Sequence, residues 1–250
     1  MQINLGPYIV DMHFHSGEKI SNHGGDAKAV VACFLKLVRS RYDEKIPIIL
    51  NADRRFLSDE NLLYFGNDLK IKYIVIGKLY YSVYETKQTC AVTESARVSA
   101  KYASWICYDY KSKLGRWENY RRTILTTLVA DDGQYVFEGI RDTVMYTNIG
   151  KNDLIDVELR MRKQDDLMKT EAIVKLAHQN GEEELNHRSI KGFMRREHLS
   201  LINFGMNGAF YSLMVISYFI MESYRYDIAN DILIQPSRSF LVKQLSDLGK

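Results

Sequence analysis

Two uninterrupted apolar segments, separated by 20 residues with a helical pattern, constrain the fold of this chain more than any other feature. The first is residues 47–52 and the second is Tyr73–Ile76. Between them, Ser58-Asp59-Glu60 can open a helix that carries three leucines. Continuous apolar strands are typical of a sheet that is covered on both faces. The sequence therefore predicts an α/β fold.

The segment before this unit predicts a hairpin followed by a helix. Residues 8–15 and 18–22 flank Ser16-Gly17, a pair suited to the turn of a hairpin. Asp26 can cap a helix, and the expected apolar face of that helix follows a period near 3.6 residues. This face comprises Val30, Phe34, Leu37 and Val38.

The amino-acid composition changes near residues 79 and 148, which predicts that the chain has three parts. Residues 79–148 are rich in Tyr, Thr, Val and Trp and contain a hairpin turn at Asp131-Asp132-Gly133. After Asn148 the pattern becomes helical and charged, and then apolar. We expect a first core part over residues 1–78, a β-rich insertion over 79–148, and a second core part with C-terminal helices over 149–250.

Bulk composition indicates a folded protein and leaves its function open. Of the 250 residues, 46% are hydrophobic and 26% are charged, which argues against intrinsic disorder. The net charge of +3 permits nucleic-acid binding without demanding it. The apolar stretch Gly208–Met221 has 14 residues, and because a bilayer span needs about 20, we expect a buried core helix and no membrane partner.

The cysteines and the N-terminus favour a cytoplasmic location. Cys33, Cys90 and Cys107 are widely spaced and form no C-x-x-C pair, so neither a zinc ribbon nor a disulfide scaffold is supported. The first residues lack the basic region and apolar core of a signal peptide.

The candidate chemical residues are acids and cations that lie far apart in the sequence. Asp53 directly follows the first apolar strand, where open α/β sheets place ligand sites, although a turn residue is the plainer interpretation. Glu184 and Lys191 are seven residues apart and share one face of a helix, as a metal ligand and a phosphate ligand would. Acidic triplets and isolated cations more often mark a solvated helix surface.

Two further patterns have structural alternatives. His13 and His15 alternate on a strand and could hold a metal with His23, but two histidines on one strand are too few for a site. Aromatic side chains in the β-rich segment could stack on bases, or could simply pack in a sheet. They are Tyr80, Tyr81, Tyr84, Trp105, Tyr108, Tyr110 and Trp117.

Two segments of the chain resemble bacterial insertion-sequence transposases of the DDE type. Residues 51–56 and the strand that ends at Gly77 resemble the region around the second catalytic aspartate of that family. Residues 181–191 resemble its signature Y-x2-R-x3-E-x6-K, with Glu184 and Lys191 in register. The similarity continues through residues 199–211 and includes Tyr146-Thr147-Asn148, where the family returns from its β insertion to the catalytic core.

The resemblance implies a fold, a reaction and a set of site residues. The fold is a ribonuclease H-like core interrupted by a β-rich insertion and followed by C-terminal helices. The activity is DNA transposition, in which acids that hold two Mg²⁺ ions direct strand cleavage and transfer at insertion-sequence ends. Asp53 and Glu184 would be the catalytic metal ligands, and Lys191, Arg188 and Arg195 would contact DNA.

The same resemblance implies partners and a location. The partners would be terminal inverted repeats and target DNA, and the assembly is compatible with a homodimer. The location would be the bacterial cytoplasm, in association with the nucleoid.

Departures from the family pattern support a second interpretation. The family's Tyr and Arg positions hold Ala177 and Asn180, and Arg54-Arg55 replaces the usual Ser-Gly. The first catalytic Asp is expected on a strand that precedes Met1, and Asp11 matches its position poorly. The alternative is therefore a truncated, catalytically inactive DNA-binding remnant. An unrelated metal-dependent nuclease is a third interpretation, which rests on the two acids and the α/β pattern alone.

Overall fold

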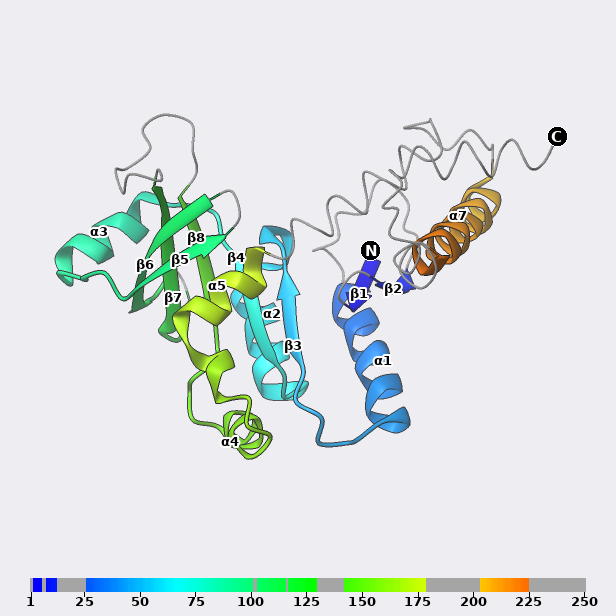
Figure 1. Cartoon of the computed structure of the whole chain (residues 1–250), viewed down its shortest axis with the longest axis horizontal. Coiled ribbons are helices and arrows are strands. Elements are labelled where there is room, and N and C mark those ends of the chain that lie inside the picture. Colours follow the sequence, from blue (N-terminus) through cyan, green and yellow to red (C-terminus); the bar gives the residue numbers. More distant parts are fainter. Residues whose placement is uncertain are drawn as a thin grey trace. The chain divides into compact units, whose positions relative to one another are not determined.

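The computed structural model describes residues 2–5, 8–12, 26–100, 103–115, 117–129, 142–178 and 203–224. The chain forms two compact units (Figure 1). One consists of residues 1–19 with 181–250, and the other consists of residues 20–180. Each unit is described by itself. The predicted boundaries near residues 78 and 148 stay predictions.

The larger unit is a mixed α/β structure built on one sheet. Its elements in chain order are α1 (Asp26–Arg41), β3 (Ile49–Ala52), η1 (Arg54–Phe56), α2 (Asp59–Leu63), η2 (Tyr64–Asp68), β4 (Lys72–Ile76), α3 (Tyr81–Thr89), β5 (Ala96–Ala100), β6 (Ala103–Ser112), β7 (Arg121–Val129), β8 (Thr143–Thr147), α4 (Leu154–Met161), η3 (Asp165–Met168) and α5 (Thr170–His178).

The six-stranded sheet has the order β3-β4-β8-β7-β6-β5. β3 and β4 run parallel, with Ala52 beside Val75, and every other neighbouring pair is antiparallel. The strands of the β-rich segment therefore continue the sheet that β3 and β4 begin. The mixed α/β class is confirmed, whereas a specifically ribonuclease H-like topology stays a prediction.

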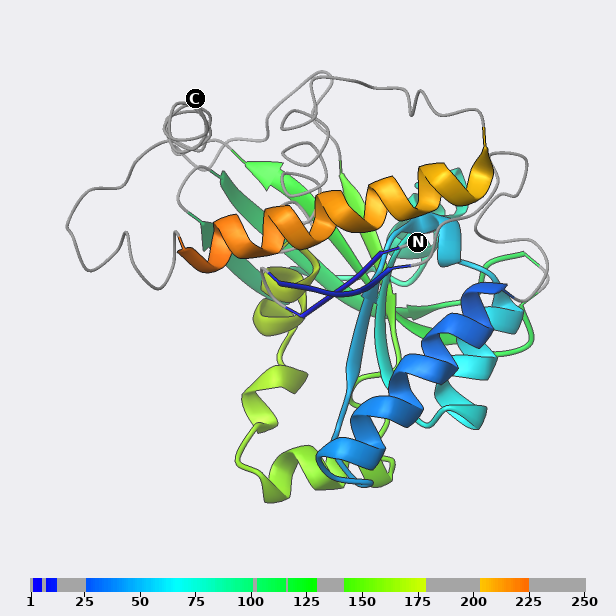
Figure 2. The same cartoon turned by 90° about the vertical axis from the view of Figure 1, so that its right-hand side faces the viewer.

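Both faces of the sheet are covered at β4, which explains the uninterrupted apolar character of this strand. Tyr73 and Val75 point into a core shared with α1, α2 and η2, and Ile74 points into a core shared with α5. All three side chains are fully buried. Figure 2, which views the sheet from its β3 side, shows α2 and α5 on opposite sides of it.

The predicted helix starts are confirmed, with one change of face. α1 begins at Asp26, and the Ser58 hydroxyl caps α2 by accepting from the Asn61 backbone N–H at 3.1 Å. In α1 the buried residues include Val31 and Leu35, whereas Leu37 is 54% exposed. The predicted apolar stripe thus included a position on the solvent side of the helix.

α3 is a helix inside the segment that the sequence marks as β-rich. Its residues include Tyr, Val and Thr, which favour strands by themselves. Tertiary contacts outweigh that preference, because Val83 is buried in the core and its carbonyl accepts from the Tyr110 hydroxyl at 3.1 Å.

A buried ion cluster connects the start of β4 to the loop before α4. The Lys72 ammonium is fully buried and lies 2.8 Å from an oxygen of Asp153 and 2.8 Å from an oxygen of Asp156. It also donates to the Asn148 carbonyl at 3.0 Å. Asp156 accepts backbone N–H groups from the loop, and Asp153 caps α4. Because each charge has several partners, this cluster fixes the β8–α4 connection.

A second polar cluster holds the start of α5 against the sheet. The Arg122 guanidinium forms a two-pronged contact with the Asp109 carboxylate, with an Nη2–Oδ2 distance of 2.6 Å. The Thr170 hydroxyl donates to the same carboxylate at 2.6 Å, and Arg122 also donates to the Met168 carbonyl at 2.9 Å. α5 is therefore held in place on β6 and β7.

The smaller unit contains an antiparallel hairpin of β1 (Gln2–Leu5) and β2 (Tyr8–Met12), together with α7 (Phe204–Tyr224). β2 pairs with residues before it, whereas the sequence predicted pairing with residues 18–22, which lie outside the described residues. Within the described part of the chain, no helix is both long and apolar enough to cross a bilayer.

α7 confirms the predicted helix over Gly208–Met221, but only one side of it is buried. Met214, Val215 and Tyr218 are at most 9% exposed, whereas Leu213 and Ile220 are more than 60% exposed. The prediction of a buried core helix is therefore correct for one face of α7 and wrong for the other.

Candidate functional site

The carboxyl ends of β3 and β4 lie at the same edge of the sheet, because the two strands are parallel. Asp53 follows β3 immediately and begins η1, while Gly77 and Lys78 follow β4. Ligand sites of open α/β sheets are found outside such strand ends. The structure thus places Asp53 where the sequence predicted it.

Asp53 keeps one carboxylate oxygen available. Its Oδ1 accepts from the Arg55 backbone N–H at 2.7 Å, which makes Asp53 the cap of η1. Its Oδ2 lies 3.9 Å from the Arg55 Nε, and the Asp53 side chain is 55% exposed. The plainer interpretation as a turn residue is correct for the first oxygen. The second oxygen can still serve as a ligand, because an exposed ion pair at this distance is weak.

The metal hypothesis depends on residues that the structure does not describe. Glu184, Lys191, Arg188 and Arg195 lie outside the described residues, as do His13, His15 and His23. β2 carries Asp11, whose side chain is likewise not described. Among the described residues, no group of three potential metal-ligating side chains occurs. Asp53 offers the oxygen chemistry that Mg²⁺ prefers, but only one carboxylate of a complete site.

One contact ties the end of α5 to β3. Asn51, two residues before Asp53, donates from its side-chain amide to the Leu176 carbonyl in the last turn of α5 at 2.6 Å. Sequence reasoning missed this contact, because an amide inside an apolar strand gives no indication of its partner.

His178, the last residue of α5, is stacked on Trp105, with ring centroids 4.3 Å apart and an angle of 16° between the rings. Burial lowers the pKa of this histidine, so the imidazole is neutral near pH 7. The pair is best explained as packing of α5 on the sheet.

The aromatic residues of the β-rich segment divide into two classes. Tyr80 is 46% exposed and Tyr81 is 80% exposed, and both follow β4 at the Asp53 edge. The other five are engaged in packing or hydrogen bonds: Tyr84 with Asp142, Trp105 with His178, Tyr108 with Lys87, Tyr110 with Val83, and Trp117 with Tyr146. The structural alternative is therefore correct for these five.

Three exposed cations follow the carboxyl ends of β3 and β4, the edge that also carries Asp53. Arg54, Arg55 and Lys78 are exposed, and the Lys78 ammonium lies 5.7 Å from the centre of the Tyr80 ring. The sequence drew attention to Arg54 and Arg55 only as departures from a family pattern, and it missed Lys78. The available signal was a lysine two residues after a buried strand and two residues before a pair of tyrosines.

Close packing fixes the path of the chain into this surface. A Cβ on Gly77 would come within 2.5 Å of the Tyr146 ring and 2.9 Å of a Val144 methyl group. Contacts below about 3 Å between carbon atoms are strongly repulsive, so only glycine fits here without movement of its neighbours. The position of Lys78 and Tyr80 thus depends on the packing of β8.

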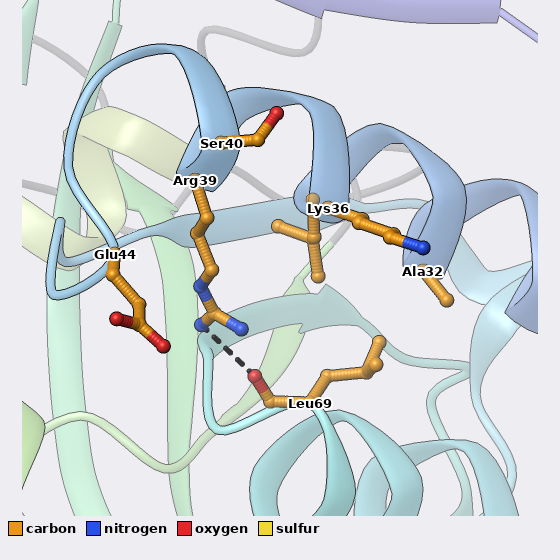
Figure 3. A pocket seen from close by; sticks show the side chains of 7 residues that line it. Ala32, Lys36, Arg39, Ser40, Glu44 and Leu69 are labelled. Carbon is orange, nitrogen blue, oxygen red and sulfur yellow. Dashed lines mark hydrogen bonds between the residues drawn. The ribbon is translucent and has the colours of Figure 1, made fainter.

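A cavity of about 440 Å³ lies elsewhere, between α1 and the turn at Leu69. Figure 3 shows Arg39 reaching across it to the Leu69 carbonyl, with Lys36 and Glu44 on its rim. Arg39 donates to Leu69 at 3.0 Å and to Lys70 at 3.2 Å, where the backbone has a positive φ of 49°. Arg39 therefore stabilises a strained turn, and the cavity contains none of the predicted site residues.

The cysteines offer no nucleophile at the candidate site. Cys107 is buried, and burial raises its pKa to about 12, so its thiol stays protonated. Cys33 and Cys90 lie on α1 and at the end of α3, respectively.

No protein-family model matches this chain, and no curated protein shows significant similarity to it.

Proposed function

We propose that this protein is a DDE-type transposase catalytic domain that performs metal-dependent cleavage and transfer of DNA strands at insertion-sequence ends. The observation that carries the proposal is the exposed carboxylate of Asp53 at the carboxyl edge of the parallel strands β3 and β4. Its surroundings are cationic, which suits a polyanionic substrate.

In this proposal Asp53 and Glu184 act together on one phosphate. The Arg55 N–H orients the Asp53 carboxylate through Oδ1 and leaves Oδ2 for a metal ligand bond. Two Mg²⁺ ions, when bound to the two acids, would supply Lewis-acid activation of the phosphate and of the attacking water or 3′-hydroxyl. Lys191, Arg188 and Arg195 would hold neighbouring phosphates.

The chain length between α5 and Glu184 permits this pairing. The Leu176 carbonyl accepts a hydrogen bond from the side chain of Asn51, which lies two residues before Asp53. Glu184 comes eight residues after Leu176. Eight residues span at most about 28 Å when fully extended. A cytoplasmic, nucleoid-associated location and a homodimer belong to the same proposal, because transposition acts on the two ends of an element that lies in chromosomal DNA.

The test is a cleavage assay on DNA that flanks the protein's own coding sequence, with Mg²⁺ or Mn²⁺ added. We expect metal-dependent nicking that falls at least about 100-fold in Asp53→Asn and in Glu184→Gln, because each variant loses a charged ligand. Asp166→Asn is the matched control, since this acid is 79% exposed and paired only locally with Lys169. It should cleave like the parent.

The outcomes separate the hypotheses. Specific binding of end DNA without cleavage by the parent protein would establish the inactive, DNA-binding alternative. Cleavage without any preference for the ends would indicate a general nuclease. Absence of DNA binding at low salt would overturn the transposase proposal.

A further inference from the structure

We propose that the carboxyl edge of β3 and β4 binds unpaired nucleotides of a DNA end, with Tyr80 and Tyr81 stacking on bases and Lys78, Arg54 and Arg55 holding phosphates. This inference rests on the proposed function for its choice of DNA. It adds a substrate-binding surface beside Asp53 and a preference for single strands.

Two adjacent tyrosines, Tyr80 and Tyr81, are exposed to solvent after β4. Tyr81 is 80% exposed and Tyr80 is 46% exposed. Aromatic rings bury large areas when they pack, so two consecutive rings in solvent give up stabilisation that the fold could have used. Five other aromatic residues of the β-rich segment are engaged in packing or hydrogen bonds, whereas Tyr120, before β7, is a further exposed ring at 66%. Exposed aromatic rings are the stacking platforms of proteins that bind single strands.

The surface at this edge is rich in exposed cations. Arg54 and Arg55 follow the end of β3, and Lys78 follows the end of β4, so three exposed cations come after the carboxyl ends of the two parallel strands, as does Asp53. Residues 77–82 contain no acid. A cationic path that carries aromatic rings is the combination that follows a nucleic-acid backbone and stacks its bases.

One exposed cation lies close to one of the exposed rings. The Lys78 ammonium lies 5.7 Å from the centre of the Tyr80 ring, so one nucleotide could place its base near the ring and its phosphate near the ammonium. Tyr80 is the N-cap residue before α3, and its side chain makes no capping hydrogen bond. The N–H groups of Tyr81 and Ser82, which precede the first bonded N–H of the helix at Val83, add donors for a phosphate next to the same rings.

The preference for unpaired DNA follows from the way stacking works. In a duplex the flat faces of internal bases are covered by their neighbours, so surface tyrosines have access only to bases that have left the stack. A strand end with a few unpaired nucleotides presents both its faces and its phosphates. We therefore expect this surface to favour single strands and frayed ends over blunt duplex DNA.

The experiment measures binding of a fluorescent 20-nucleotide thymidine strand by anisotropy, in EDTA, so that the result does not depend on metal or cleavage. Tyr81→Ala and Tyr80→Ala should each weaken binding by about 5- to 150-fold, the range for loss of one stacked base. Lys78→Ala should flatten the dependence of log affinity on log salt by about 0.7.

Matched controls lie at the opposite edge of the sheet. Tyr120 is 66% exposed and precedes β7. The start of β7 pairs with the end of β8, and the end of β8 pairs with the first half of β4, so Tyr120 lies away from Lys78, which follows the end of β4. Lys111 on β6 is exposed and lies beside Arg122 at that same far edge. Tyr120→Ala and Lys111→Ala should bind like the parent. All these side chains are exposed, so unchanged thermal unfolding will show that the variants remain folded.

The outcomes distinguish this inference from the proposed function. If Tyr81→Ala and Tyr120→Ala bind the strand equally, or if a blunt duplex binds as tightly as the single strand, the inference is overturned. Tighter binding to RNA of matching sequence would overturn the assignment to DNA. Loss of binding in the tyrosine variants together with a parent protein that never cleaves would support this surface while removing the transposase activity.

Discussion

Replacement of the buried Lys72 by methionine should destabilise the larger unit strongly. The ammonium is fully buried, and each of two carboxylates lies 2.8 Å from it. Asp156 is also fully buried, so removal of the lysine leaves a buried negative charge without its cation. Removal of one partner from a buried ion pair costs about 3–5 kcal/mol. Since Asp156 keeps two backbone N–H donors, we expect about 3 kcal/mol, toward the lower end of that range.

The assay is urea unfolding followed by tryptophan fluorescence. Both tryptophans of the chain, Trp105 and Trp117, belong to the larger unit, so the signal reports on the region that contains Lys72. A loss of about 3 kcal/mol should also lower the melting temperature by about 6–12 °C for a domain of this size.

Two further variants make the Lys72 prediction refutable. Lys169→Met removes a lysine that is 66% exposed and should change the stability by less than about 0.5 kcal/mol. Lys72→Met combined with Asp156→Asn should recover about 1–2 kcal/mol, because the uncompensated charge is then absent. A loss below about 1 kcal/mol for Lys72→Met alone would refute the view that this cluster anchors the β8–α4 connection.

Three other predictions concern the same unit. The side chain of Asp153→Asn can still cap α4, but the variant loses the ion pair with Lys72. Burial raises the pKa of the Asp153 carboxyl, but hydrogen bonds from Lys72 and from backbone N–H groups lower it by more, so its net pKa is depressed. The parent should therefore be more stable than Asp153→Asn at pH 7, and urea titrations should show the gap closing as the pH falls below about 4. Gly77→Ala should cost about 1–3 kcal/mol in thermal unfolding because its Cβ meets the Tyr146 ring at 2.5 Å, and a loss below about 0.5 kcal/mol would mean that the ring moves freely. Arg55→Ser removes a cation 3.9 Å from Asp53 and should tighten Mg²⁺ binding, measured by calorimetry, by about two- to fivefold; unchanged binding would argue against a metal at this carboxylate.

β4 could be predicted because it is buried on both faces, with its first four residues buried. β3 has an apolar run of partly buried residues that ends at the buried Ala52, and the Ser58 cap lies at a standard helix-start pattern. α3 could not be predicted in this way, because its residues favour strands and only the burial of Val83 reveals the helix.

The polar clusters could not be predicted, because their partners are distant in sequence. Lys72 meets Asp153 and Asp156, more than 80 residues later. A lysine at the start of a strand reads as a surface residue until the β8–α4 loop folds over it. For the candidate site, the sequence indicated Asp53 correctly as a residue at a strand end, whereas its pairing with Glu184 stays a prediction. The exposure of Tyr80 and Tyr81 depends on where the chain turns after Gly77.

The pairing of β4 with β8 has a consequence for the timing of synthesis. Ile76 lies beside Met145, so β4 waits for about 70 more residues before its second neighbour exists. At about 5–20 residues per second, a ribosome needs about 4–14 s to add them. Until then the strand that follows Asp53 is paired on one side only, and Gly77 has no Tyr146 to pack against. A nascent chain therefore cannot complete the packing around Gly77, or the second pairing of β4, until β8 has been synthesised.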